Sequence, residues 1–409
     1  MSIAAQENAQ PPSGSDTKIR VAVNGVLVPV VVRDSHGRAV GGLKKEDFQV
    51  FDGNKAQDIS GFTVQQRAGV EGNRASREPA PVRPDTPQPA ATAPTRFIVF
   101  LFDDLHLSTG DLLRMQKVAT TMLGQSVADT DMAAVVSLSG MNSGLTHDRA
   151  KLQDAVEKLK VQQLFRHDEH ACPNISFYQA DLIQNKHNEP ALKTAEADYV
   201  ACAALVNASP YMVESMVKSS AEQSLVNGEH DVSASLRTVR EFVQKMGTLP
   251  GQRTLILISP GFFTMTPEAM AEKSLVLDSA ARSNVTISAM DARGLYTTEI
   301  DASERGGSSA QDLATGQHAQ YRADSMNFDE DVMSELADGT GGTYFHNSND
   351  LEGGLRSLAA APEYVYLLEL SLEKVKQDGS YHRLKIKVDR DGVRLQARHG
   401  YFAPKKDKM

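Results

Sequence analysis

Residues 97–112, with the sequence FIVFLFDDLHLSTGDL, join six consecutive apolar residues to a short segment rich in acidic and hydroxyl side chains. A continuous apolar run of this length is typical of a strand that is buried on both faces of a parallel sheet. Ligands of such sheets bind just beyond the carboxyl ends of the strands. We therefore expect the polar segment 103–108 to lie at a binding edge.

Strand and helix patterns alternate along the chain after this stretch. Helical spacing occurs at 110–126, 147–161, 233–249, 267–284 and 329–341, and strand-like runs at 131–139, 253–259, 285–292 and 343–347. Repeated β–α units predict a parallel, doubly wound α/β sheet with helices on both faces. We assign this domain to residues 96–360, with a mostly helical insertion at about 162–230.

Strand-like patterns flank the α/β domain on both sides. Residues 18–65 and 361–404 alternate apolar and polar residues and contain DG turn signals. Each segment is too short to cover an apolar face alone, so we expect the two to form one small β-sandwich. Residues 66–95 hold six prolines and read as a linker, and 1–17 and 405–409 read as tails.

Composition excludes several classes of partner. The 409-residue chain has a net charge of −9 and no Lys/Arg run apart from KKDK near its end, so we expect no nucleic-acid partner. No stretch reaches the ~18 to 20 consecutive apolar residues of a membrane span. The first 18 residues lack the charged and apolar regions of a signal peptide, but their small polar residues are typical of the start of an exported, processed protein.

Several blocks resemble the VWFA-related proteins best known from Acidobacteria, a branch of the von Willebrand factor type A superfamily. They are VPVVVRDSHGRAVGGLKKEDFQVFDG, FLFDDLHLS, LPGQRTLILISPGFF, ISAMDARGLY, LADGTGGTYFHNSNDL and LQARHGYFAP. The resemblance spans about residues 20 to 404 and keeps the order of the blocks. It implies a Rossmann-like sheet, a periplasmic or extracellular location, and protein binding rather than catalysis.

Type A domains commonly hold a divalent cation, and the resemblance implies where its ligands would lie. The D-x-S-x-S motif of such domains reads here Asp104, Leu105, His106, Leu107 and Ser108, so an imidazole replaces one hydroxyl. The usual later aspartate is replaced by proline at position 260, and the usual threonine has no clear counterpart. Because Mg²⁺ prefers hard oxygen ligands, we expect a degenerate ion site that binds Mg²⁺ or Mn²⁺ weakly.

The same residues fit other roles. Asp104 could cap the following helix or hold its loop through backbone N–H groups, and Ser108 or Thr109 could serve as the helix N-cap. His106 could be an exposed loop histidine, or it could shift the ion preference to Mn²⁺ or Zn²⁺, which accept imidazole. The stretch also resembles haloacid-dehalogenase-like phosphatases, with Asp104 as nucleophile and Ser259 as phosphate ligand. That chemistry needs a carboxylate two residues after the nucleophile, where His106 stands.

The insertion contains both cysteines, Cys172 and Cys202. A disulfide, two free thiols and a metal site are all consistent with the sequence. The metal alternative would use these thiols together with four histidines, namely His167, His170, His187 and His230.

From these observations we expect a non-enzymatic adhesion or scaffold module. Its partner-binding edge would comprise Asp103, Asp104 and Ser259, at the carboxyl ends of two strands. The insertion would cover or extend this edge, with its aromatic residues forming either its own small core or contact anchors.

Overall fold

The computed structural model describes residues 25–35, 38–66, 96–126, 131–162, 172–264, 266–295, 316–360, 362, 364–371 and 381–402. The tails expected at 1–17 and 405–409 lie outside the described residues, as does nearly all of the linker expected at 66–95.

A five-stranded parallel sheet forms the centre of the α/β unit, with the strand order β6-β5-β7-β8-β9. Its strands are β5 (Arg96–Phe102), β6 (Asp131–Ser137), β7 (Gln252–Ser259), β8 (Thr286–Asp291) and β9 (Tyr344–Phe345). β5 pairs with β6 on one side and β7 on the other, and all seven of its residues are buried. The apolar run FIVFLF is therefore explained by burial on both faces, and the predicted parallel sheet is confirmed.

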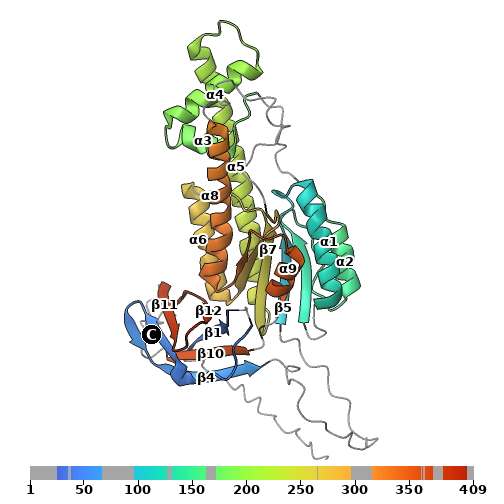
Figure 1. Ribbon diagram of the computed structural model, residues 1–409, viewed down its shortest axis with the longest axis vertical. Coiled ribbons are helices and arrows are strands. Elements are labelled where there is room, and N and C mark those ends of the chain that lie inside the picture. Colours follow the sequence, from blue (N-terminus) through green and yellow to red (C-terminus); the bar gives the residue numbers. More distant parts are fainter. Residues whose placement is uncertain are drawn as a thin grey trace, which may run out of the picture.

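Helices cover both faces of this sheet (Figure 1). One face packs against α1 (Thr109–Ser126), α2 (Arg149–Glu157) and α9 (Leu351–Ala359). The other packs against α5 (Pro210–Gly247), α6 (Pro267–Ser283) and α8 (Gln317–Thr340). Each face buries its own cluster of aliphatic side chains, so the carboxyl edge of the sheet is left as the place where loops meet.

Three helices depart from the sequence prediction. α5 is one continuous helix of 38 residues, so the expected helix start at 233 is wrong. α8 begins at Gln317, twelve residues before the expected start at 329, and α9 was not predicted. The described part of the insertion is helical as expected, with α3 (Phe177–Gln184), α4 (Glu189–Cys202) and the first half of α5.

Segments from both ends of the chain pair in two four-stranded antiparallel sheets, with the orders β12-β1-β10-β4 and β13-β11-β2-β3. The N-terminal strands are β1 (Gly25–Arg33), β2 (Phe48–Asp52), β3 (Lys55–Gln57) and β4 (Ile59–Gln66), and a short 3-10 helix, η1 (Lys45–Asp47), precedes β2. The C-terminal strands are β10 (Tyr364–Ser371), β11 (Tyr381–Val388), β12 (Arg394–Ala397) and β13 (Gly400–Phe402). Neither sheet could form from one end of the chain alone.

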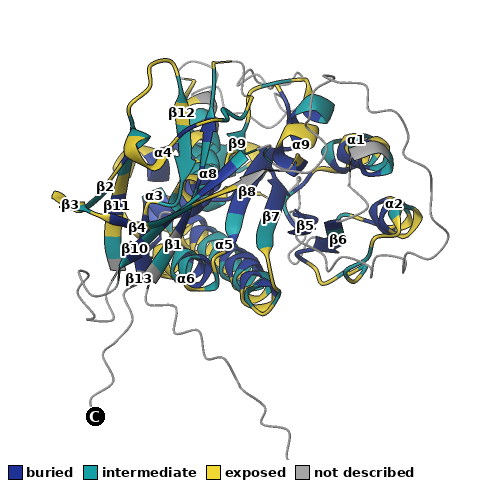
Figure 2. Cartoon of the chain, turned by 90° about the horizontal axis from the view of Figure 1, so that it is seen from below, coloured by how far each residue is buried: buried dark blue, intermediate teal, exposed yellow. Residues whose placement is uncertain are grey.

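Both terminal sheets contribute to a single buried cluster, which includes Val30, Val50, Tyr366 and Leu384. Figure 2 shows how buried residues concentrate within the sheets while the exposed residues lie on the outer helix faces and loops. The terminal sheets contact the α/β unit at the end of α8, where a Cβ atom on Gly341 would lie 2.6 Å from the backbone of Ala397. Among the helices that the structure describes, none combines the length and apolarity needed to cross a bilayer.

Tyr366 links the two ends of the chain by polar contacts as well as packing. Its side chain is fully buried, its hydroxyl donates to the carbonyl of Val40 at 2.7 Å, and it accepts from the amide of Leu43 at 3.3 Å. We predict that Tyr366→Phe lowers the free energy of unfolding by about 1–3 kcal/mol, because the buried amide of Leu43 and the partly buried carbonyl of Val40 lose their partner. Urea denaturation measures this. Tyr211→Phe, at a residue 83% exposed, is the control and should change stability by less than about 0.5 kcal/mol.

Candidate functional site

The carboxylate of Asp103 joins the ends of β5 and β7. Asp103 is fully buried directly after β5, and its Oδ2 accepts a hydrogen bond from Ser259 Oγ at the end of β7, at 2.6 Å. Its Oδ1 accepts from the amides of Leu105 and His106 at 3.2 and 3.0 Å. His106 Nδ1 lies 2.8 and 2.9 Å from the two carboxylate oxygens. Because a carboxylate only accepts, Nδ1 carries the proton and Nε2 is the free nitrogen of neutral His106.

Asp104 joins β5 to its other neighbour, β6. The side chain is buried, its Oδ1 accepts from the amide of Ser139 at 2.9 Å, and its Oδ2 accepts a short hydrogen bond from Ser139 Oγ. The carbonyl of Asp104 accepts from the amide of Gln162 at 2.7 Å. The two consecutive aspartates thus fix the loops that follow the two neighbouring strands.

The side chains expected to bind a cation do not converge on one point. Asp104 is bound to Ser139, His106 to Asp103, and Ser108 caps α1 by accepting from the amide of Asp111 at 3.1 Å. Within the described ranges, no group of three or more His, Cys, Asp or Glu side chains could hold a metal ion. The donors therefore do not fit the divalent cation that the resemblance implies. Ser108 caps α1, as one alternative expected, whereas Asp104 holds the loop after β6 and Asp103 accepts from the amides of the loop after β5.

The expected partner-binding edge also needs correction. Asp103, Asp104 and Ser259 are all at most 2% exposed, and each is hydrogen-bonded within the chain. Side chains in this state cannot contact a partner protein directly. The same observation disfavours the phosphatase alternative, because a nucleophilic Asp104 needs a carboxylate oxygen open to the substrate.

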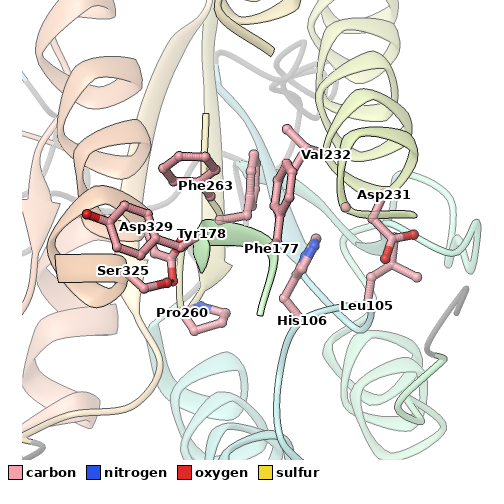
Figure 3. Close-up of a pocket in the computed structure, with 13 residues that line it drawn as sticks. Leu105, His106, Phe177, Tyr178, Asp231, Val232, Pro260, Phe263, Ser325 and Asp329 are labelled. Atoms are coloured by element: carbon pink, nitrogen blue, oxygen red, sulfur yellow. The ribbon is translucent and has the colours of Figure 1, made fainter. Parts of the chain in front are cut away.

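A cavity of about 390 Å³ lies beyond the carboxyl ends of β5 and β7, and Figure 3 shows the side chains around it. Its lining combines the two loops that follow these strands with residues of α3, α5 and α8. The lining residues are Leu105, His106, Phe177, Tyr178, Gly228, Asp231, Val232, Pro260, Gly261, Phe262, Phe263, Ser325 and Asp329. The cavity thus lies where the resemblance places the ion, and it shares His106 and Pro260 with that site but not Asp104 or Ser108.

Aromatic rings join the insertion to this edge. Phe177 and Tyr178, at the start of α3, contact Phe263 edge-on at centroid distances of 5.2 and 5.6 Å. Phe328 of α8 lies 5.9 Å from Phe263, and the His106 ring stacks on Phe262 at 5.2 Å. The insertion therefore covers the edge as expected, with Phe177 and Tyr178 as its contacts.

Gly261 permits the close approach of α8 to this loop. Its φ of +90° is in the region that favours glycine, and a Cβ atom would lie 2.0 Å from the carbonyl oxygen of Asp329. Any side chain at position 261 would push α8 away. The glycine of the SPG sequence at the end of β7 thus allows α8 to bring Asp329 to the cavity.

Burial and nearby charges shift the pKa values of three cavity residues. Burial lowers the pKa of His106, but the charge and hydrogen bond of Asp103 outweigh it, so the net pKa is raised. Burial raises the pKa of Asp231, which His106 partly opposes. Burial raises the pKa of Asp329 to about 6, against the opposing effects of Arg293 and His106. Perturbed groups of this kind are typical of functional sites.

Asp231 and Asp329 were not identified from the sequence. Asp231 lies on α5, whose start was placed too late, at 233 instead of 210. Asp329 falls within the predicted helix 329–341, but nothing in its spacing showed that it would lie at the edge of the sheet. A usable signal for α5 was the pair Ser209-Pro210, since proline is common at the first helical position after a serine.

The insertion has its own small core and a disulfide. Aliphatic residues of α3, α4 and the first half of α5 form a separate buried cluster that includes Ile183, Leu192 and Val217. Cys172 and Cys202 are bonded, with their Cα atoms 5.8 Å apart. Both thiols are consumed, so the zinc alternative that needed them does not apply. His167 and His170 lie outside the described residues.

No protein-family model matches the chain, and no curated protein is significantly similar to it.

We predict that Asp329→Asn stabilises the protein at neutral pH. The folded-state pKa of about 6 lies above the usual 3.8, so the folded chain binds the proton more tightly and this group's contribution to stability falls as the pH rises from about 4 to 6. Removing the charge should raise the free energy of unfolding by about 1–3 kcal/mol at pH 7.5 and by much less at pH 4. Urea denaturation at both pH values measures this.

The control for this prediction is Asp331→Asn, at an exposed position two residues further along α8. It should change stability by less than about 0.5 kcal/mol at either pH. A loss of stability in Asp329→Asn that is equal at pH 4 and pH 7.5 would contradict the account.

Proposed function

We propose that the chain is a non-enzymatic protein-binding module of the von Willebrand factor type A class, with its recognition surface on the helical insertion. Its ion site is degenerate, because the residues at the ligand positions are hydrogen-bonded within the chain. In this proposal the parallel sheet is a Rossmann-like scaffold. The two antiparallel sheets form one β-sandwich that supports it. The sequence resemblance supports the class, and exposed apolar residues of the insertion support the surface.

The apolar tip of the insertion, defined as Val200, Val206, Tyr211, Met212 and Met216, is the observation that carries the proposal. These five are among eleven large apolar side chains that are exposed in the described part of the chain, yet they lie within 17 consecutive residues. Such a concentration differs from the single exposed apolar residues that are common on protein surfaces. Tyr and Met are also enriched where proteins meet.

The local structure favours contact with a partner. Met212 and Met216 are four residues apart in α5 and so share one helix face. Cys202 ties the end of α4 to Cys172, which restrains the segment that carries Val206 and reduces the entropy lost on binding. Charged pairs such as Glu214–Lys218 lie beside the apolar residues, as in the polar rim of an interface.

The disulfide also supports an exported location, which we include in the proposal. Disulfides persist in oxidising compartments such as the periplasm and the extracellular space, and they are uncommon in the cytosol. The phosphatase alternative receives no comparable support, since Asp104 does not line the cavity.

Photo-cross-linking tests the proposed surface. p-Benzoylphenylalanine is placed at Tyr211 in the full chain, the protein is incubated with envelope extract of the native cells, and the products are identified by mass spectrometry. We predict one dominant heterologous product from position 211. The matched control is the same residue at Leu275, an exposed apolar position on α6, which should give none.

The double variant Met212→Ser/Met216→Ser should reduce the cross-linked yield at least tenfold, while Leu275→Ser should leave it unchanged. Point variants are preferable to deletion of the insertion, because deletion would also remove Phe177 and Tyr178 from the cavity. Equal labelling from positions 211 and 275, or a product that contains only a second copy of the chain, would overturn the proposal.

A further inference from the structure

The cavity at the carboxyl edge of the sheet has an unusual charge balance. Asp231 enters it from α5 and Asp329 from α8, and Figure 3 shows them on opposite sides of the space. Among the described residues that line it, none is Lys or Arg. The one lining residue able to carry a positive charge is His106, whose Nδ1 is already held by Asp103. The two carboxylates therefore have no full counter-charge within the cavity.

One carboxylate oxygen of Asp231 lacks a hydrogen-bond donor among the described residues. Its Oδ1 has no contact with solvent, and no group in the described part of the chain donates a hydrogen bond to it. Among the described residues, Asp329 accepts a weak hydrogen bond from Ser325 Oγ at 3.5 Å. Leaving a buried carboxylate oxygen without a hydrogen-bond donor costs free energy, and a bound water, an ion or a ligand can supply the missing donor.

The remaining walls favour an apolar body on the ligand. Phe177, Tyr178, Phe262 and Phe263 all line the space. The faces of aromatic rings attract cations, and the attraction is stronger where water is excluded. The volume of about 390 Å³ lies in the usual range of sites for small organic molecules or a single long side chain.

Other ligand classes fit less well. An anion would meet two carboxylates, and a neutral apolar molecule would leave both of them unpaired. A metal ion would need three close ligands, which the described residues do not provide. We propose that the cavity binds an organic cation, an ammonium or guanidinium-type group carried on an apolar body. In its neutral form, His106 would offer Nε2 as a further acceptor. This site is independent of the apolar tip and of the proposed protein partner.

Calorimetry with matched probes tests the proposal on the wild-type protein. Benzamidine is an aromatic cation, and benzamide is its neutral isostere. We expect benzamidine to bind at least tenfold more tightly than benzamide at pH 7.5. Equal affinity of the two probes, or no binding of benzamidine, would overturn the proposal.

Substitutions of the two cavity carboxylates test whether benzamidine binds in this cavity. Asp231→Asn and Asp329→Asn should each weaken benzamidine binding at least tenfold and leave benzamide unaffected. The control is Asp331→Asn, which lies on the same helix as Asp329 and removes the same charge. This variant should bind benzamidine as tightly as the wild-type protein. Because loss of a buried unpaired charge does not unfold a protein, these variants remain testable, and circular dichroism confirms their fold. Unchanged affinity in both cavity variants would place any binding elsewhere.

Two sources could supply such a cation, a free small molecule or a basic side chain of another protein. Binding of the peptide acetyl-Gly-Arg-Gly-amide distinguishes these two sources. Its citrulline analogue, which is neutral and nearly isosteric, is the control for the charge. Arginine-peptide binding that requires Asp231 would indicate that the cavity admits a side chain. Benzamidine binding without peptide binding would indicate a free cation, and either result supports the cation site.

Discussion

The carboxylate of Asp103 accepts hydrogen bonds from four donors, two backbone amides of its own loop, His106 Nδ1 and Ser259 Oγ. These donors come from the ends of two adjacent strands, so one buried group fixes the loops after both β5 and β7. Ser259 Oγ in turn accepts from the amide of Gly261 at 2.9 Å. The cavity, the position of His106 and the approach of α8 all depend on this arrangement.

The same arrangement explains why this edge differs from a cation-binding adhesion site. A cation needs carboxylate and hydroxyl oxygens that are free and that converge, whereas here Asp103 and Asp104 turn toward opposite neighbouring strands and are fully engaged. Helices α3, α5 and α8 then cover the edge and, with the loops after β5 and β7, line an open cavity. In our proposal, protein recognition therefore belongs to the apolar tip of the insertion, and the edge of the sheet offers a cavity of small-ligand size.

Local sequence patterns predicted those parts of the structure that depend on local burial. The run at 97–102 is apolar throughout because β5 is buried on both faces, and the parallel sheet follows from the repetition of such units. The pairing of the chain ends was predictable because neither segment could cover its own apolar face. Ser108 was predictable as a cap because the cap and the helix are adjacent in sequence.

The cavity was not predictable in the same way, since its contacts are long-range. Ser139 binds an aspartate 35 positions away, and Ser259 binds one 156 positions away. Asp231 lies on a part of α5 that apolar periodicity did not indicate, and Asp329 reaches the edge through the close approach of α8 to Gly261. Spacing along the chain carries no information about such distances when a helical insertion intervenes.

The protonation state of His106 tests the role of Asp103 most directly. It is measured by nitrogen-15 NMR on protein labelled at histidine, and the variant His106→Gln assigns the His106 signals. The account predicts that neutral His106 carries its proton on Nδ1 and that its pKa lies above the ordinary 6.5, since the Asp103 carboxylate outweighs the effect of burial. A proton on Nε2, or a pKa below 6.5, would show that Asp103 does not orient His106 and would contradict the account.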